Sequence, residues 1–75
     1  MNDLLGQAAR LYAARDYPAA ESVCRTIILT NPHHFDALHL LGVLLTLQDR
    51  SDEAVICLRA AQAERPDHPQ MQVNL

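Results

Sequence analysis

The amino-acid sequence predicts an all-α fold in which antiparallel helix-turn-helix repeats stack as a short α-solenoid. The first observation is an internal repeat, because shifting the chain by 34 residues superposes similar residues, and this period belongs to a helix-turn-helix unit. Seven identities occur in the 41 compared positions, mostly where stacked helices restrict side-chain size. The second is composition, since 49% of residues are hydrophobic but only three are aromatic, which favours an aliphatic helical core. The matching residues of the first and second units are Leu4/Leu38, Ala8/Gly42, Leu11/Leu45, Ala20/Ala54, Cys24/Leu58 and Pro32/Pro66.

The first unit contains two expected helices. Apolar residues recur every three or four positions from Leu4 to about Ala14, which indicates one buried helical face. Pro18 interrupts the chain and fits the first turn of a second helix, with Asp16 or Tyr17 near its cap. That helix ends at 31–32, because the residue before a proline is pushed out of the helical conformation.

The second unit repeats this plan. The segment from Phe35 to Leu47 is the most apolar in the chain, and Gly42 lies where a larger side chain would hold the partner helix away. A further helix begins at Ser51, with two acidic residues in its positive first turn, and ends before Pro66. Residues 69–75 are expected to form the start of a third repeat or a short capping helix. The expected organisation is therefore 1–34, 35–68 and 69–75.

Charge and composition exclude several functional classes. The net charge is −3 and the chain has no lysine, so the electrostatic attraction of nucleic-acid binding is missing. No stretch approaches the roughly 20 apolar residues of a membrane span, and the start of the chain does not read as a signal peptide. We therefore expect a cytoplasmic protein that binds neither nucleic acid nor a membrane.

No catalytic motif appears, so we expect no enzyme activity and no cofactor. The histidine turn His33, His34, Asp36 and His39 has the residue types of a metal site. We favour a solvated turn and helix cap over a metal site there, and predict no metal. Cys24 and Cys57 lie at apolar helical positions and are expected to be reduced, with a bridge between chains through Cys57 as the alternative.

These residues resemble the tetratricopeptide repeat family. The second unit carries the pattern best, with Leu38, Leu41, Gly42, Leu45, Ala54, Leu58, Ala61 and Pro66 at family positions, and it looks bacterial. The resemblance implies a right-handed solenoid that binds a peptide or protein partner in a groove lined by the first helix of each unit. By position, the groove residues would be Asn2, Leu5, Ala9, Tyr12, Asp36, His39, Val43 and Thr46. The family's clamp for a terminal carboxylate is absent, because Leu5, Ala9, His39 and Val43 occupy its positions.

Repeat arrays hide apolar terminal faces, so we also expect a homo-oligomer. Its surface would come from residues 69–75 and from the last full helix, where we expect an apolar face of Val55, Ile56, Leu58 and Ala61. The expected self-association residues are Val55, Ile56, Met71, Val73 and Leu75. An alternative is that the chain is the N-terminal regulatory or substrate-recruiting segment of a larger enzyme, such as a bacterial glycosyltransferase.

Overall fold

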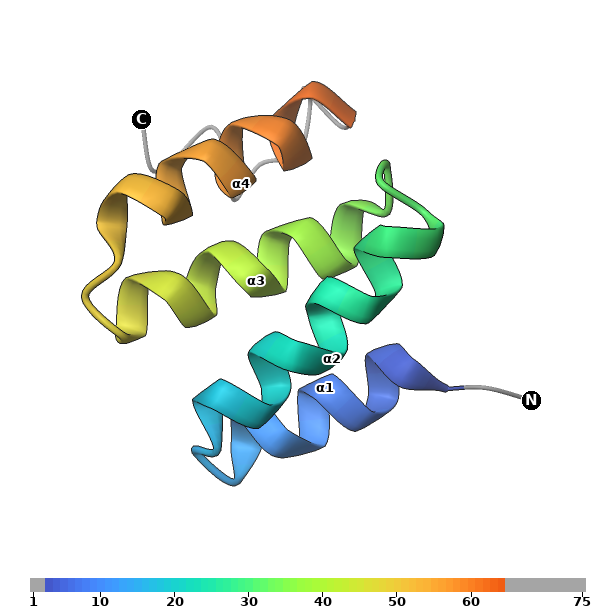
Figure 1. The fold of residues 1–75 in the computed structure, drawn as a ribbon, viewed down its shortest axis with the longest axis vertical. Helices are drawn as coiled ribbons and strands as arrows, with labels where there is room; N and C mark the ends of the chain where they lie inside the picture. Colours follow the sequence, from blue (N-terminus) through green and yellow to red (C-terminus); the bar gives the residue numbers. More distant parts are fainter. Residues whose placement is uncertain (1–2, 65–75) are drawn as a thin grey trace.

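The computed structural model describes residues 3–64, which form four α-helices and no strand. They are α1 (Leu4–Ala13), α2 (Tyr17–Thr30), α3 (Phe35–Leu47) and α4 (Ser51–Glu64). Figure 1 shows them in chain order, α2 lying between α1 and α3, and α4 covering the far side of α3. The predicted all-α fold of stacked helix hairpins is confirmed.

The helix bounds follow the 34-residue period. Shifting α2 by this step gives the bounds of α4, and the last residue of α1 falls on the last residue of α3. Only the start of α1 departs, because α3 begins three residues earlier in its repeat. The repeat boundaries 1–34 and 35–68 stay predictions, and segment 69–75 lies outside the described residues.

Local chemistry begins each helix. The Asp3 carboxylate accepts a hydrogen bond from the Gly6 amide at 3.0 Å, and the His34 ring accepts one from the Ala37 amide at 3.1 Å. Both side chains satisfy donors that the first helical turn leaves free. Asp16 caps α2 through its backbone, with Pro18 in the first turn, and Asp52 and Glu53 occupy the first turn of α4.

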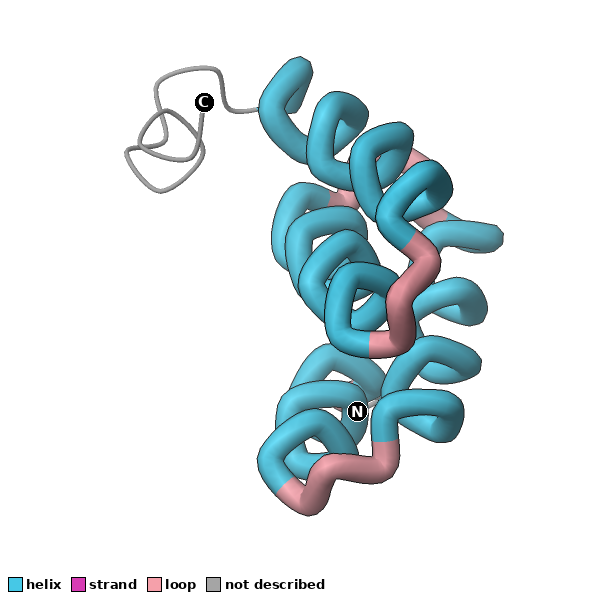
Figure 2. The backbone as a smooth tube through the Cα atoms, turned by 90° about the vertical axis from the view of Figure 1, so that its left-hand side faces the viewer, coloured by secondary structure: helices cyan, strands magenta, loops and turns pink. Residues whose placement is uncertain are grey.

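One buried cluster joins all four helices. It contains residues of every helix and is centred on the fully buried Leu44 and Leu45 of α3. Its buried members are Ala8, Ala20, Cys24, Leu41, Leu44, Leu45 and Ala54. A second cluster of Phe35, Leu38 and Ala61 fastens α3 to α4. Figure 2 shows that only short loops connect the four helices, so the stacking fixes where their outer faces lie.

Gly42 allows α3 and α4 to approach closely. A Cβ atom placed on Gly42 would lie 2.5 Å from Cδ2 and 2.6 Å from Cγ of Leu58, well inside van der Waals contact. The corresponding pair in the first unit is Ala8 and Cys24, a larger residue opposite a smaller one. The predicted reason for this glycine is therefore confirmed.

Candidate protein-binding surface

The first part of the candidate surface is a strip on α1. Leu5, Ala9 and Tyr12 follow one another at helical spacing, so their side chains share one side of the helix. Ala9 and Tyr12 are exposed and Leu5 is half-buried, while the buried residue of this helix is Ala8. Asn2, the fourth predicted residue of this strip, lies outside the described residues.

The second part is a strip on α3. Asp36, His39, Val43 and Thr46 are also spaced by three or four residues, and none belongs to the buried clusters. The His39 ring stacks on the Phe35 ring, with centroids 5.7 Å apart and planes 19° apart. The Thr46 hydroxyl donates to the Gly42 carbonyl at 2.9 Å, so it is already satisfied within its own helix. The strip therefore offers carbon surface, one imidazole and one carboxylate.

The two strips lie on neighbouring helices, because α1 contacts α3. Near the C-terminal end of α1, the centroid of the Tyr12 ring lies 6.0 Å from that of the Tyr17 ring, and Tyr12 keeps 39% of its surface exposed. An exposed tyrosine held by a neighbouring ring offers a large apolar area with little loss of side-chain freedom on binding. The surface suits contact with another chain.

A small pocket of about 200 Å³ opens beside the α1 strip. It lies between the start of α1, the end of α2 and the turn before α3, and its wall includes the predicted residue Leu5. The lining residues are Asp3, Leu4, Leu5, Ile27, Thr30 and His34. The sequence did not indicate this pocket, because it combines three segments that only the stacking of α1 to α3 brings together.

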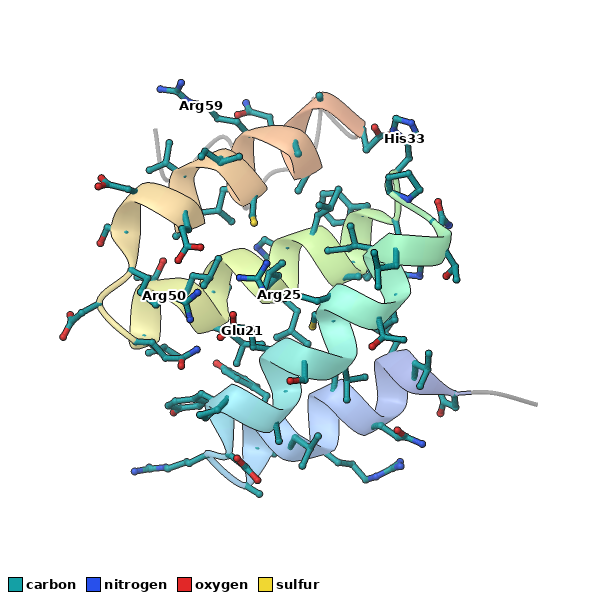
Figure 3. All side chains as sticks on the ribbon, in the orientation of Figure 1. Glu21, Arg25, His33, Arg50 and Arg59 are labelled. Carbon is teal, nitrogen blue, oxygen red and sulfur yellow. The ribbon has the colours of Figure 1, made fainter. Side chains whose placement is uncertain are left out.

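The histidine turn has structural partners. His34 caps α3, as expected of a turn and helix cap, and Nδ1 of His33 lies 2.7 Å from Oε2 of Glu64 at the end of α4. Figure 3 shows His33 beside that end of α4. Among residues 3–64, no three His, Cys, Asp or Glu side chains gather as metal ligands.

A buried ionic cluster was missed by the sequence analysis. Glu21 of α2 is only 8% exposed, and its carboxylate accepts hydrogen bonds from Arg25 at 2.9 Å, Arg50 at 2.9 Å and Gln48 at 3.1 Å. Arg50 also donates to Glu53 at 2.6 Å. In Figure 3 the labelled side chains of Glu21, Arg25 and Arg50 converge between α2 and α3.

Electrostatics keep the Glu21 carboxylate ionised. Burial by itself raises the pKa of Glu21, but the hydrogen bonds from Arg25 and Gln48 and the charges of Arg25 and Arg50 outweigh it. The pKa of Glu21 therefore lies below its ordinary value. In the sequence, the only sign of this cluster is that Glu21 lies next to Ala20 on the buried side of α2. Its partner Arg50 comes from the distant α3–α4 turn, which the sequence pattern does not connect to α2.

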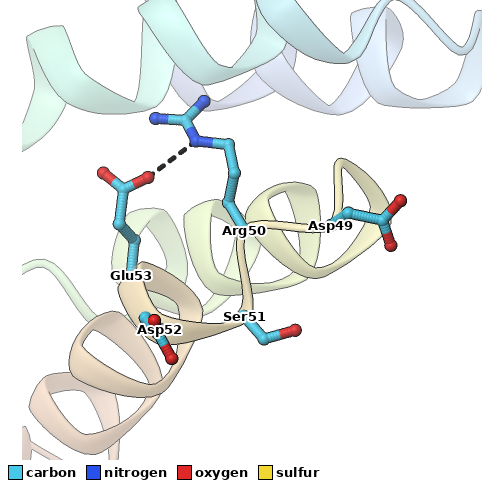
Figure 4. Close-up of a pocket in the computed structure, with 5 residues that line it drawn as sticks. All are labelled: Asp49, Arg50, Ser51, Asp52 and Glu53. Carbon is cyan, nitrogen blue, oxygen red and sulfur yellow. Dashed lines mark hydrogen bonds and ion pairs between the residues drawn. The ribbon is translucent and has the colours of Figure 1, made fainter.

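A second hollow of about 360 Å³ lies at the α3–α4 turn and is lined by residues 49–53. Figure 4 shows Arg50 and Glu53 paired, while Asp49 and Asp52 point in different directions away from that pair. Its carboxylates therefore do not face a common point.

The outer side of α4 carries the predicted self-association residues Val55 and Ile56, which are 45% and 69% exposed. The expectation that Leu58 and Ala61 share this exposed apolar face was wrong. Ala61 is fully buried with Phe35 and Leu38, and the half-buried Leu58 packs on the same cluster, so both face α3. Met71, Val73 and Leu75 lie outside the described residues.

Both cysteines are unbridged within the chain. Burial, assisted by the Glu21 charge, raises the pKa of Cys24 to about 11, and burial also raises the pKa of Cys57. Neither thiol is therefore activated as a nucleophile.

In residues 3–64 no helix combines the length and apolar character that crossing a membrane requires. A family model described as tetratricopeptide repeat matches residues 11–73. No curated protein and no solved structure matches the chain.

Proposed function

Because the chain belongs to the tetratricopeptide repeat family, we propose that it holds a peptide or protein partner against the joined α1 and α3 strips. Repeats of this family generally mediate protein–protein interaction and are typically scaffolds without catalysis. The observation that carries the proposal is the contrast between the two sides of α1 and α3. One side of each helix enters the common core, while the predicted groove residues within residues 3–64 stay at least partly exposed.

The surface chemistry favours an extended segment with apolar side chains. Leu5, Ala9, Val43 and the exposed Tyr12 supply carbon contacts, while Asp36 and His39 can select polar groups. The pocket beside Leu5 has room for about one side chain of the partner. The absence of the family's carboxylate clamp at Leu5, Ala9, His39 and Val43 favours an internal segment over a chain terminus.

The test begins with a displayed peptide library selected against the intact chain, followed by affinity measurements with a selected peptide. Replacing Tyr12 with Ala should weaken binding by about tenfold, as loss of a tyrosine anchor does at other interfaces. The Tyr12→Phe variant keeps the ring and should bind nearly as well. Ser22→Ala, on the exposed side of α2, should leave affinity unchanged.

Equal affinity of Tyr12→Ala and the unchanged chain would contradict binding at this surface. Equal loss in Tyr12→Ala and Ser22→Ala would contradict it too, since the two residues lie on different helix faces. Circular dichroism of each variant shows that loss of affinity is not loss of folding.

A second candidate function is self-association through α4. The observation that favours it is the exposure of Val55 and Ile56, two apolar residues adjacent on one helix. Sedimentation equilibrium over a range of concentrations should show a reversible dimer or larger species. A monomer at every concentration would contradict this second function and leave the first untouched.

A further inference from the structure

The outer side of α4 carries a strip of four exposed residues, Asp52, Val55, Ile56 and Arg59. With 3.6 residues per turn, these positions fall within about 100° of one another around the helix axis. Ala54 and Ala61 occupy the opposite side and are buried. Figure 3 shows Arg59 extending outward from α4. Within residues 3–64, Asp52 and Arg59 take part in no ion pair with one another or with another side chain.

Reversed, the strip is complementary to itself, because its acidic end then lies opposite its basic end and its apolar residues lie opposite each other. It runs acidic, apolar, apolar, basic, with steps of three, one and three residues. When two copies of α4 lie antiparallel across a two-fold axis between positions 55 and 56, Asp52 faces Arg59 of the second copy and Val55 faces Ile56 of the second copy. A parallel arrangement would instead place each charge opposite its own kind.

Head-to-tail stacking of copies fits less well. On α3, Ala37, Leu41 and Leu44 are buried, and Leu41 and Leu44 share a core cluster with residues of α2. The residues 34 positions earlier, on the corresponding side of α1, are all polar and exposed: Asp3, Gln7 and Arg10. Stacking α4 of one copy on α1 of the next would press Val55, which takes the place of Glu21, against these polar groups.

The ionic cluster around Glu21 also argues against head-to-tail stacking. Between the two units, Glu21 of α2 meets Arg50 of the next turn. A head-to-tail contact would replace Glu21 by Val55 and Arg50 by Asp16, the residues one repeat away. The Glu21–Arg50 ion pair would be lost, because Val55 carries no charge.

We infer that the α4 strip is a two-fold interface between two copies of this chain, with Asp52 and Arg59 setting the antiparallel direction. This inference rests on the proposed self-association and gives it a geometry. One helix per copy provides a contact at the small end of protein interfaces, below about 1,200 Å², so the dimer is weak and reversible. Symmetric contacts of this kind close on themselves, and no filament follows.

The test uses two charge variants of the full chain, Asp52→Arg and Arg59→Asp, in sedimentation equilibrium up to about 1 mM, the range in which weak complexes dissociate. Each variant alone brings like charges together in the dimer, so its self-association should weaken at least about tenfold. An equimolar mixture should dimerise again, because two basic residues on one copy then face two acidic residues on the other. The recovered association should weaken as salt is raised.

The controls separate this geometry from self-association in general. Arg10→Asp changes an exposed charge on α1 and should not alter dimerisation, whereas weakening by this variant would point to head-to-tail stacking and overturn the inference. Circular dichroism verifies that each variant is folded. A dimer that both α4 variants leave unchanged, or a mixture that stays monomeric, overturns the α4 geometry while self-association stands. A monomeric unchanged chain overturns both.

Discussion

At the scale of single residues, Arg15 and Asp49 fix the turn inside each helix hairpin. They stand one repeat apart, and both have left-handed backbone conformations, with φ of 65° and 60°. In each turn the next residue donates its amide to a carbonyl five positions back, Asp16 to Leu11 at 2.9 Å and Arg50 to Leu45 at 2.8 Å. This is the Schellman ending, in which glycine is normally preferred.

Replacing Arg15 with Gly should therefore stabilise the chain. A left-handed residue with a Cβ costs about 1–2 kcal/mol, and glycine removes this cost while losing roughly 0.5–1 kcal/mol of chain entropy. We expect the free energy of unfolding to rise by about 0.5 kcal/mol in chemical denaturation. Ala14→Gly is the matched control, because Ala14 has φ of −79° and glycine there should only destabilise. A destabilised Arg15→Gly variant would contradict this account of the turn.

Gly42 illustrates the opposite constraint, a lack of space. In Gly42→Ala the new methyl group meets Leu58, and overpacking of about 1–3 kcal/mol should outweigh the gain of about 1 kcal/mol in helix propensity. Denaturant titration should show a net loss of stability. The double variant Gly42→Ala with Leu58→Ala should show a coupling, since the second change removes the clash. Additive losses in the double variant would argue against that contact.

At the scale of elements, the Glu21 cluster joins α2 to the α3–α4 turn and so fixes how one hairpin sits on the next. Arg50, from the turn, reaches the same carboxylate as Arg25 of α2. The arginine side chains are 40% and 46% exposed, so water screens part of these ion pairs. The Glu21 carboxylate is buried and cannot be hydrated, so it depends on these hydrogen bonds more than the exposed arginines do.

Glu21→Gln should lower the free energy of unfolding by about 1–2 kcal/mol at neutral pH, because the buried group loses its charge-assisted hydrogen bonds. The folded-state pKa of Glu21 is depressed, so its contribution is present above the ordinary value of 4.5 and is lost as pH falls through the folded-state pKa. The difference between the two chains should therefore shrink in acid. Urea titrations at several pH values measure it, and a difference that grows in acid would contradict the cluster.

The elements themselves were predictable from the sequence, while the contacts between them were not. Pro18, the proline at 32 and the 34-residue period give bounds for α2, α3 and α4, because these signals act within a few residues. The Glu21 cluster and the pocket beside Leu5 join segments about 30 residues apart. Likewise, Ala61 was expected on the apolar terminal side of α4, although it packs inward on Phe35 and Leu38.

At the scale of the whole molecule, one core cluster draws on all four helices, so the two hairpins share a core. The side of α1 and α3 that does not enter this core carries Leu5, Ala9, Tyr12, His39 and Val43. The stacking of the two hairpins brings α1 into contact with α3, and we propose that the two strips form one binding surface. A partner that spans both helices would contact the two strips together.

The most direct test is the amide spectrum of the isotope-labelled chain, recorded while a selected peptide is added. The account predicts that the largest shift changes fall on α1 and α3, around Tyr12, His39 and Val43, with little change along the outer side of α2. Shift changes confined to α2 and α4, with the residues around Tyr12 and His39 unmoved, would contradict it.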